Sequence, residues 1–243
     1  MRSPLTALAA LPILAAPLLA LPTASAASCT APELVNASVD PGTVVLGVTR
    51  AKGVEIEVAV RTNGCAVSVG TDVFTASDYV DTLDMEEVGT AGGVTTYRTG
   101  ARINPGAFPN TDAGTFRTSV YVSWGRQHLG DDGPTFRLLR ASRLTTNASP
   151  EPVIKGRPLT VTGTLTRANW ETLRYAGYTK RAVKLQFKAS GGSWATVGTA
   201  TSGAGGKLST TVGARRDGCY RFVFPGSSTT AKVTSGADCV DVR

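Results

Sequence analysis

The sequence predicts an all-β protein made of two antiparallel β-sandwiches in tandem, which follow a cleaved signal peptide. Three observations support this prediction. The first residues have the pattern of an export signal, and short runs of alternating apolar and polar residues recur through the rest of the chain. Gly-, Pro- and Ser-rich turn signals separate those runs. Six or seven short strands in about 100 residues is the spacing of a β-sandwich.

Residues 1–26 have the pattern of a secretory signal peptide. A short basic start precedes an Ala/Leu-rich run over 5–21, and the small residues at 24–26 suit a signal peptidase. The run is too short and too often interrupted by proline to cross a bilayer as a helix. We therefore expect a mature chain that begins near Ala27 and is secreted to the extracellular space.

Four widely spaced cysteines, an even number in an oxidising compartment, predict two disulfides; they are Cys29, Cys65, Cys219 and Cys239. No C-x-x-C pair occurs, which argues against a zinc site or a redox motif. We expect one bridge in each sandwich, Cys29–Cys65 and Cys219–Cys239. Cys219 and Cys239 are out of phase with the apolar residues beside them, so both should point outward from neighbouring strands. An alternative for Cys29 is lipidation, which would leave Cys65 unpaired.

Residues 27–140 form the predicted N-terminal sandwich. Alternating apolar residues predict strands at 44–48, 54–60, 116–124 and 136–138. Residues 72–103 fit neither a strand nor a helix period well, and we expect strands there with long connections.

Residues 141–243 form the predicted C-terminal sandwich, in which the alternation is stricter. It predicts strands at 159–166, 183–188, 207–212, 219–224 and 239–242. No Gly/Ser-rich or Pro-rich tether separates the two halves. We therefore expect the sandwiches to lie end to end with restricted freedom.

The second half resembles a C-terminal domain that is common in secreted actinobacterial proteins and distantly related to bacterial Ig-like repeats. The segments that carry the resemblance are 147–153, 159–170, 175–178, 183–187, 220–222 and 240–242. It is specific over 143–243 and looser over 33–140. The resemblance implies two tandem Ig-like β-sandwiches in an exported, largely uncharacterised protein. Some relatives carry a calcium-binding label. This chain departs from the pattern at Cys219 and Cys239.

The sequence gives no sign of catalytic chemistry. His128 is the sole histidine, and no nucleophile elbow, phosphate-binding loop, H-E-x-x-H or dinucleotide motif occurs. We expect His128 to be exposed in a loop over 124–133, and we expect no enzyme activity. A hydrolase with paired carboxylates from distant strands stays open as a further alternative.

Charge is divided unevenly between the halves. Residues 27–140 hold 9 Lys/Arg and 13 Asp/Glu, a net of −4, whereas residues 141–243 hold 15 and 5, a net of +10. If the third, sixth and seventh strands of the second sandwich share a sheet, their outward positions bring together Lys184, Lys188, Arg221 and Arg243. Asp241 is the only acid expected to temper this face. This face could bind anionic cell-wall polymer or polysaccharide, with a solvated basic face as the plain alternative. The charge asymmetry also allows head-to-tail self-association.

One acidic stretch of the first half contains no Lys or Arg: Asp72, Asp78, Asp81, Asp84, Glu86 and Glu87. Calcium prefers several carboxylate oxygens, so these residues are the candidate ligands of a calcium-binding module. The EF-hand spacing is missing, and a solvated acidic face is the favoured interpretation. Apart from calcium, we expect no cofactor.

Aromatic and basic residues gather in the connection between the second and third strands of the second half; they are Trp170, Arg174, Tyr175 and Tyr178. Exposed loops at the end of a sandwich often bind ligands. In the plain alternative the loop folds its aromatic rings onto the sandwich to cover the core.

These patterns predict a secreted, non-enzymatic binding or accessory protein that acts at or near the cell envelope. A calcium-binding extracellular module is the chief alternative.

Overall fold

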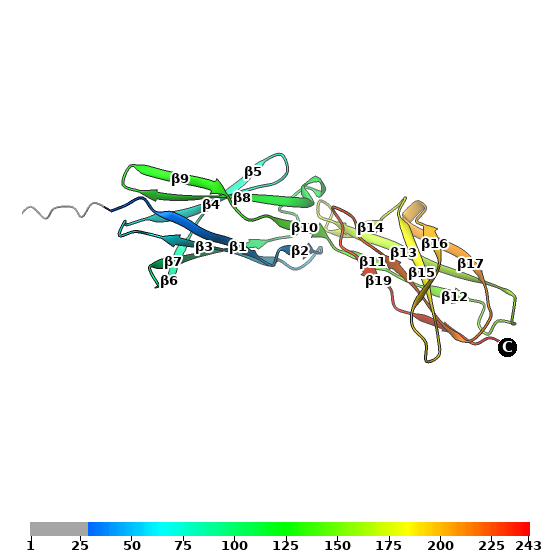
Figure 1. The fold of residues 1–243 in the computed structure, drawn as a ribbon. Helices are drawn as coiled ribbons and strands as arrows, with labels where there is room; N and C mark the ends of the chain where they lie inside the picture. The colour runs from blue at the N-terminus through cyan, green and yellow to red at the C-terminus, as the bar shows by residue number, and fades with distance from the viewer. Residues whose placement is uncertain (1–28) are drawn as a thin grey trace, which may run out of the picture.

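The computed structural model describes residues 29–243, and the predicted signal peptide at 1–26 lies outside these residues. Two β-sandwiches lie end to end, and the two ends of the described chain are at opposite ends of the elongated molecule (Figure 1). The all-β prediction is confirmed: apart from the single-turn helices η1 (Asn110–Asp112) and η2 (Ala204–Gly206), the regular elements of the described chain are strands.

The first sandwich contains ten strands. They are β1 (Glu33–Asp40), β2 (Thr43–Leu46), β3 (Lys52–Arg61), β4 (Ser68–Phe74), β5 (Tyr79–Asp84), β6 (Glu86–Ala91), β7 (Val94–Ile103), β8 (Gly114–Trp124), β9 (Gln127–Asp132) and β10 (Phe136–Arg140). One sheet has the order β1-β3-β7-β6 and the other β2-β10-β8-β4-β5, with β9 paired to β8. This is the ABED and GFC arrangement of an Ig-like sandwich.

The second sandwich is built from the remaining strands. They are β11 (Ser142–Leu144), β12 (Asn147–Ser149), β13 (Pro158–Asn169), β14 (Arg174–Gly177), β15 (Ala182–Ala189), β16 (Ala195–Thr201), β17 (Lys207–Gly213), β18 (Gly218–Phe224), β19 (Val233–Thr234) and β20 (Asp238–Val240). In one sheet β13 pairs with β11, β12, β14 and β17; in the other the order is β16-β15-β18-β19, with β20 also paired to β18. Pairing of β13 with β17 and of β15 with β18 gives a Greek-key sandwich.

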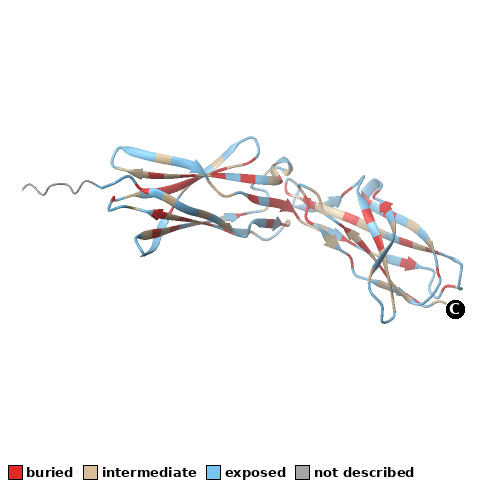
Figure 2. Ribbon diagram, viewed as in Figure 1, coloured by how far each residue is buried: buried red, intermediate tan, exposed pale blue. Residues whose placement is uncertain are grey.

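Alternation in the sequence becomes alternation in burial. On β3 the side chains of Val54, Ile56, Val58 and Val60 face the core, and the charged residues between them face solvent. Figure 2 shows the buried residues between the sheets of each sandwich. The buried side chains form two clusters, one for each sandwich.

The segment at 72–103 differs from its prediction, because its strands follow one another with short connections. Only Met85 separates β5 from β6. Gly92 and Gly93, with φ of 57° and 77°, join β6 to β7. Two residues with positive φ form the tight turn that suits a hairpin, and glycine adopts this conformation without a steric cost.

The two sandwiches are joined by one residue, Ala141, and by a network of hydrogen bonds. The side-chain Nδ2 of Asn110 donates to Asn169 Oδ1 at 2.9 Å, and the backbone N–H of Asn110 donates to Glu171 Oε1 at 3.1 Å. The buried Arg140 Nε donates to the Ala168 carbonyl at 2.6 Å. Burial, with repulsion from Arg167, lowers the pKa of Arg140 to about 10. These contacts agree with the expected restriction of movement between the halves.

Candidate ligand-binding surfaces of the second sandwich

Three predicted cations share the outward face of the sheet that contains β15 and β18. Lys184 lies opposite Val223, and Lys188 lies opposite Cys219. Arg221 lies opposite Gln186, midway between the two lysines. We call Lys184, Arg221 and Lys188 the basic row. At the rise of a β-strand the two lysines are about 13 Å apart along the sheet, so successive cations are about 7 Å apart along the strands.

Arg221 is held in place by two neighbours. Its Nε donates to Gln186 Oε1 at 2.9 Å, and its guanidinium carbon lies 4.0 Å from the ring centroid of Trp194. Lys188 Nζ lies 5.9 Å from the same ring. Cation–π contacts of this kind orient the charged groups over an aromatic surface. The terminal nitrogens of Arg221 stay available to a ligand.

The face around the basic row lacks carboxylates in its cross-strand pairs. Thr199 lies beside Lys184, and Thr196 lies beside Gln186. On the β20 side of β18, the Cys219–Cys239 bridge lies next to Lys188. Within residues 29–243, no ion pair involves a residue of the basic row. Its three cations therefore lack a direct carboxylate partner among the described residues.

The fourth predicted cation, Arg243, is not part of this sheet, and its assignment to the same face was wrong. β20 ends at Val240. The Arg243 amide then donates to the Val153 carbonyl, and the Arg243 carbonyl accepts from Lys155. The chain leaves β18 and runs beside the residues that follow β12, because Val153 and Val242 form a parallel bridge.

Trp194 is a member of this surface that the sequence analysis missed. It follows the turn at 190–193, which was interpreted as a turn signal alone. An aromatic residue directly after a Gly/Ser turn was the available signal, but the direction of its ring depends on the cross-strand register of Lys188 and Arg221.

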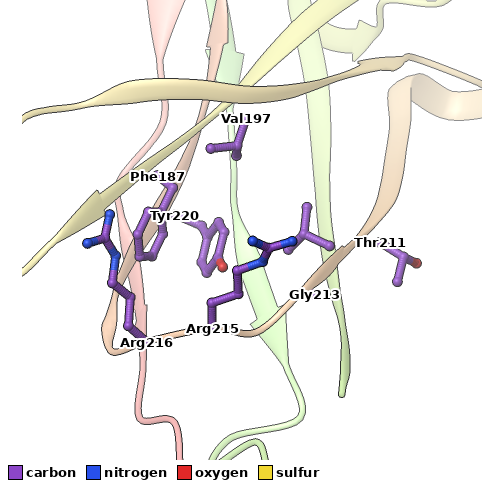
Figure 3. A pocket seen from close by; sticks show the side chains of 8 residues that line it. Phe187, Val197, Thr211, Gly213, Arg215, Arg216 and Tyr220 are labelled. Atoms are coloured by element: carbon purple, nitrogen blue, oxygen red, sulfur yellow. The ribbon is translucent and has the colours of Figure 1, made fainter. Parts of the chain in front are cut away.

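A second surface feature lies at the end of the same sandwich, where Arg215 and Arg216 flank a cavity of about 460 Å³. The rings of Phe187 and Tyr220 form its floor, with their centroids 4.8 Å apart. Figure 3 shows the two rings next to each other beneath Val197, with one arginine on each side. We call this cavity the Arg215–Arg216 pocket. Burial raises the pKa of Tyr220, so its hydroxyl is neutral at physiological pH.

The predicted ligand loop is instead a structural contact, and the assignment of its aromatic residues to a ligand was wrong. Residues 167–181 form a hairpin in which β14 pairs with β13. Trp170 is fully buried in the core of the first sandwich, and its Nε1 donates to the Leu46 carbonyl at 3.2 Å. Tyr178 is buried in the second core.

Tyr175 is half-buried, with the guanidinium carbon of Arg143 3.7 Å from its ring centroid. Of the four predicted residues only Arg174 is exposed. The plain alternative, in which the rings cover a core, is what the structure shows. The core that Trp170 covers is that of the neighbouring sandwich, because the β13–β14 turn projects across the junction.

The six candidate calcium ligands are not brought into one site, and their assignment to a single centre was wrong. Asp72 lies on β4, Asp78 in the bend before β5, and Asp81 and Asp84 on β5, whereas Glu86 and Glu87 lie on β6 in the opposite sheet. Met85 is buried and turns the chain from one sheet to the other. Across the described chain, no group of three or more acidic, His or Cys side chains could hold a metal ion.

Arg98 from β7 also changes the electrostatics of this region. Its Nη2 lies 2.8 Å from Glu57 Oε2, and its Nε lies 3.2 Å from Glu55 Oε1. The hydrogen bond to Glu57 and the charge of Glu55 raise the pKa of Arg98. The acidic stretch has no cation in sequence, but the fold places one beside it, since Glu86 pairs with Arg98. Calcium binding stays a prediction.

The two predicted disulfides are present. Cys29 is bonded to Cys65 and Cys219 to Cys239, and the described chain has no free cysteine. Cys29 is thus not a free thiol for lipidation. Cys219 and Cys239 lie directly opposite each other on β18 and β20, as their phase in the sequence predicted.

His128 is exposed, but it lies on β9 and not in a loop. Gly125 and Arg126 form the turn of the β8–β9 hairpin, so the loop expected over 124–133 is wrong.

No family model and no curated protein sequence matches this chain. Among solved structures, the Escherichia coli adhesin FdeC is 14% identical to this chain, with a TM-score of 0.38. The match covers 89% of this chain and 65% of the FdeC chain. The ectodomain of mouse nectin-like molecule 4 is 12% identical, with 88% and 64% covered and a TM-score of 0.28. A cycloalternan-forming enzyme from Listeria monocytogenes is 8% identical, with 81% and 17% covered and a TM-score of 0.39.

The chain thus spans less than two thirds of the length of each of these three proteins. In the part of the chain that the structure describes, no helix has the length and apolarity that a membrane crossing requires.

Proposed function

We propose that this chain is a secreted, non-enzymatic binding protein that holds an extended polyanion along the outward face of β15 and β18, at or near the cell envelope. The observation that carries the proposal is the basic row. Three cations follow one another along the sheet, none has an ion-pair partner within the described residues, and Trp194 lies beside two of them.

The spacing of the basic row favours an extended polymer over a compact anion. Cations about 7 Å apart along the strands match a chain that carries one negative charge per repeat of similar length. The backbone positions of the basic row extend over about 13 Å of strand, which exceeds the size of a small anion. Wall teichoic acid and anionic polysaccharide are extracellular polymers with this chemistry.

The experiment is retention of the mature chain on immobilised wall teichoic acid, with a neutral polysaccharide as reference. We expect retention on the anionic polymer that weakens steeply as salt rises, because exposed charges are screened within about 8 Å at physiological ionic strength. Lys184→Glu with Lys188→Glu reverses two of the three charges and should abolish retention.

The matched control is Lys155→Glu with Lys207→Glu, which changes the net charge equally at two exposed lysines away from the basic row. This control should keep most of the retention. Equal loss in both double variants would show attraction to net charge alone. Retention that ignores salt, or that survives Lys184→Glu with Lys188→Glu, would contradict the proposal.

A further inference from the structure

We infer that the Arg215–Arg216 pocket is a second binding site, for a single anionic sugar unit that carries a carboxylate or a phosphate. The inference goes beyond the polyanion surface and uses different residues, so either can fail alone. The volume of the pocket is about 460 Å³, which lies within the ~300–1,000 Å³ typical of small-ligand pockets.

The floor of the pocket is apolar and rigid. Phe187 packs against Tyr220, and the glycine at position 218 lets the Phe187 ring lie directly against β18. A Cβ atom at Gly218 would lie 2.5 Å from the Phe187 ring, which no real contact allows. The ring is thus confined by the backbone beneath it. A flat aromatic floor of this kind suits the C–H face of a sugar ring.

A β-bulge places a third apolar group over this floor. The register between β15 and β16 jumps from Leu185–Gly198 to Gln186–Thr196, which leaves Val197 unpaired. Bulges redirect side chains and are frequent beside binding sites. Val197 is 46% exposed and lines the pocket. Pockets for small ligands are lined mainly by apolar and aromatic side chains, and Val197 with the two rings gives this pocket such a lining.

The rim supplies positive charge that the protein leaves unpaired. The guanidinium carbon of Arg216 lies 5.8 Å from the Phe187 ring centroid. Asp217 is the adjacent acid in sequence, but its Oδ1 accepts a hydrogen bond from the Val242 amide at 2.7 Å. Neither Arg215 nor Arg216 takes part in an ion pair with another described residue.

Charge and shape together define the ligand class. Two guanidinium groups bind carboxylate or phosphate oxygens with paired hydrogen bonds. The hydroxyl of Tyr220 can bond to a sugar hydroxyl, since Tyr220 lines the pocket. A purely apolar ligand would leave the two arginines unused, and a bare inorganic anion would leave the aromatic floor unused. An anionic sugar ring uses both.

The experiment is calorimetric titration of the mature chain with glucuronate, glucose 6-phosphate and glucose. We expect at least one anionic sugar to bind at least tenfold more tightly than glucose, and the better of the two identifies carboxylate or phosphate as the preferred group. Arg215→Gln with Arg216→Gln should weaken that binding at least tenfold. Both arginines are exposed, so the variant should keep the melting temperature of the parent protein.

Two controls separate this site from the polyanion surface. Lys184→Glu with Lys188→Glu should leave the sugar affinity within twofold, while it abolishes retention on teichoic acid. Inorganic phosphate should bind at least tenfold more weakly than glucose 6-phosphate, because it cannot use the floor. The inference is overturned if neither anionic sugar binds, if glucose or phosphate alone binds equally well, or if the double arginine variant binds like the parent.

Discussion

Trp170 shows how one side chain can join two folding units. It belongs by sequence to the second sandwich, yet it is buried in the core of the first and donates its indole N–H to the Leu46 carbonyl. A buried indole of this size contributes both apolar area and a satisfied hydrogen bond. Removing the Trp170 side chain should therefore destabilise the first sandwich, although Trp170 follows a strand of the second.

Trp170→Ala should lower the free energy of unfolding of the first sandwich by about 3–5 kcal/mol, because a large cavity is left behind. The Leu46 carbonyl also loses one of its two donors and keeps only the Ala141 amide. Urea unfolding followed by tryptophan fluorescence in a Trp194→Phe background measures this change, because the remaining tryptophans then report the first sandwich. Arg174→Ala alters an exposed residue of the same hairpin and should change it by less than about 0.5 kcal/mol. Equal effects of the two substitutions would refute the assigned role of Trp170.

Tyr220 gives the protein a defined alkaline limit. Burial raises its pKa above the ordinary 10.0, whereas the unfolded chain ionises at the ordinary value. The stabilisation is therefore fully present below pH 10 and is lost as pH rises through the folded-state pKa. The unfolding free energy of the parent protein should fall over this range, and that of Tyr220→Phe should fall less. Urea unfolding at a series of pH values checks this, and identical slopes would contradict it.

At the scale of the strand, the apolar phase of the sequence was sufficient to place most elements. Residues 54–60 and 183–188 became β3 and β15 with the predicted faces inward, because a period of two buries every second residue. The same phase predicted the Cys219–Cys239 pair. Gly92-Gly93 was a readable hairpin signal that the prediction of long connections overlooked.

What the sequence could not show were contacts set by partners distant in the chain. Residues 167–181 were interpreted as the connection between the second and third strands of the second sandwich. Trp170 from this segment packs instead in the core of the other sandwich. Trp194 lies next to the basic row because its ring contacts the guanidinium group of Arg221. Arg243 does not lie on this face because the pairing of β20 with β18 ends at Val240. Each outcome depends on tertiary register, which local periodicity does not contain.

The bridge between β18 and β20 should stabilise the edge of the basic face. Cys219→Ala with Cys239→Ala opens a loop with a sequence separation of 20 residues. In the chain-entropy model this costs about 3 kcal/mol of stability. Urea unfolding of the double variant, beside the parent under the same non-reducing conditions, measures the loss. Unchanged stability would mean that the backbone pairing of β18 with β20 is sufficient by itself.

At the scale of the whole molecule, hydrogen bonds at the junction define a preferred arrangement of the two sandwiches. Asn110 is central, because it contacts Asn169, Trp170 and Glu171. Asn110→Ala with Glu171→Ala should broaden the distribution of shapes in solution, while the melting temperature falls only slightly. Small-angle X-ray scattering measures the distribution. Asn36→Ala, an exposed asparagine on β1, is the control, and a distribution as narrow as in the parent would contradict this prediction.

The two disulfides give this elongated molecule a mechanical property. When the chain is pulled at Cys29 and Arg243, tension passes through the sulfur atoms from Cys29 to Cys65 and from Cys219 to Cys239. The segments 30–64 and 220–238 that they enclose are excluded from the load, so β1, β2, β3 and β19 cannot lengthen. Extension is confined to residues 66–218, which include the one-residue junction, and to the last residues after Cys239. A protein tethered under flow would thus lengthen mainly between the two disulfide-closed segments, in the stretch that contains the junction between the sandwiches.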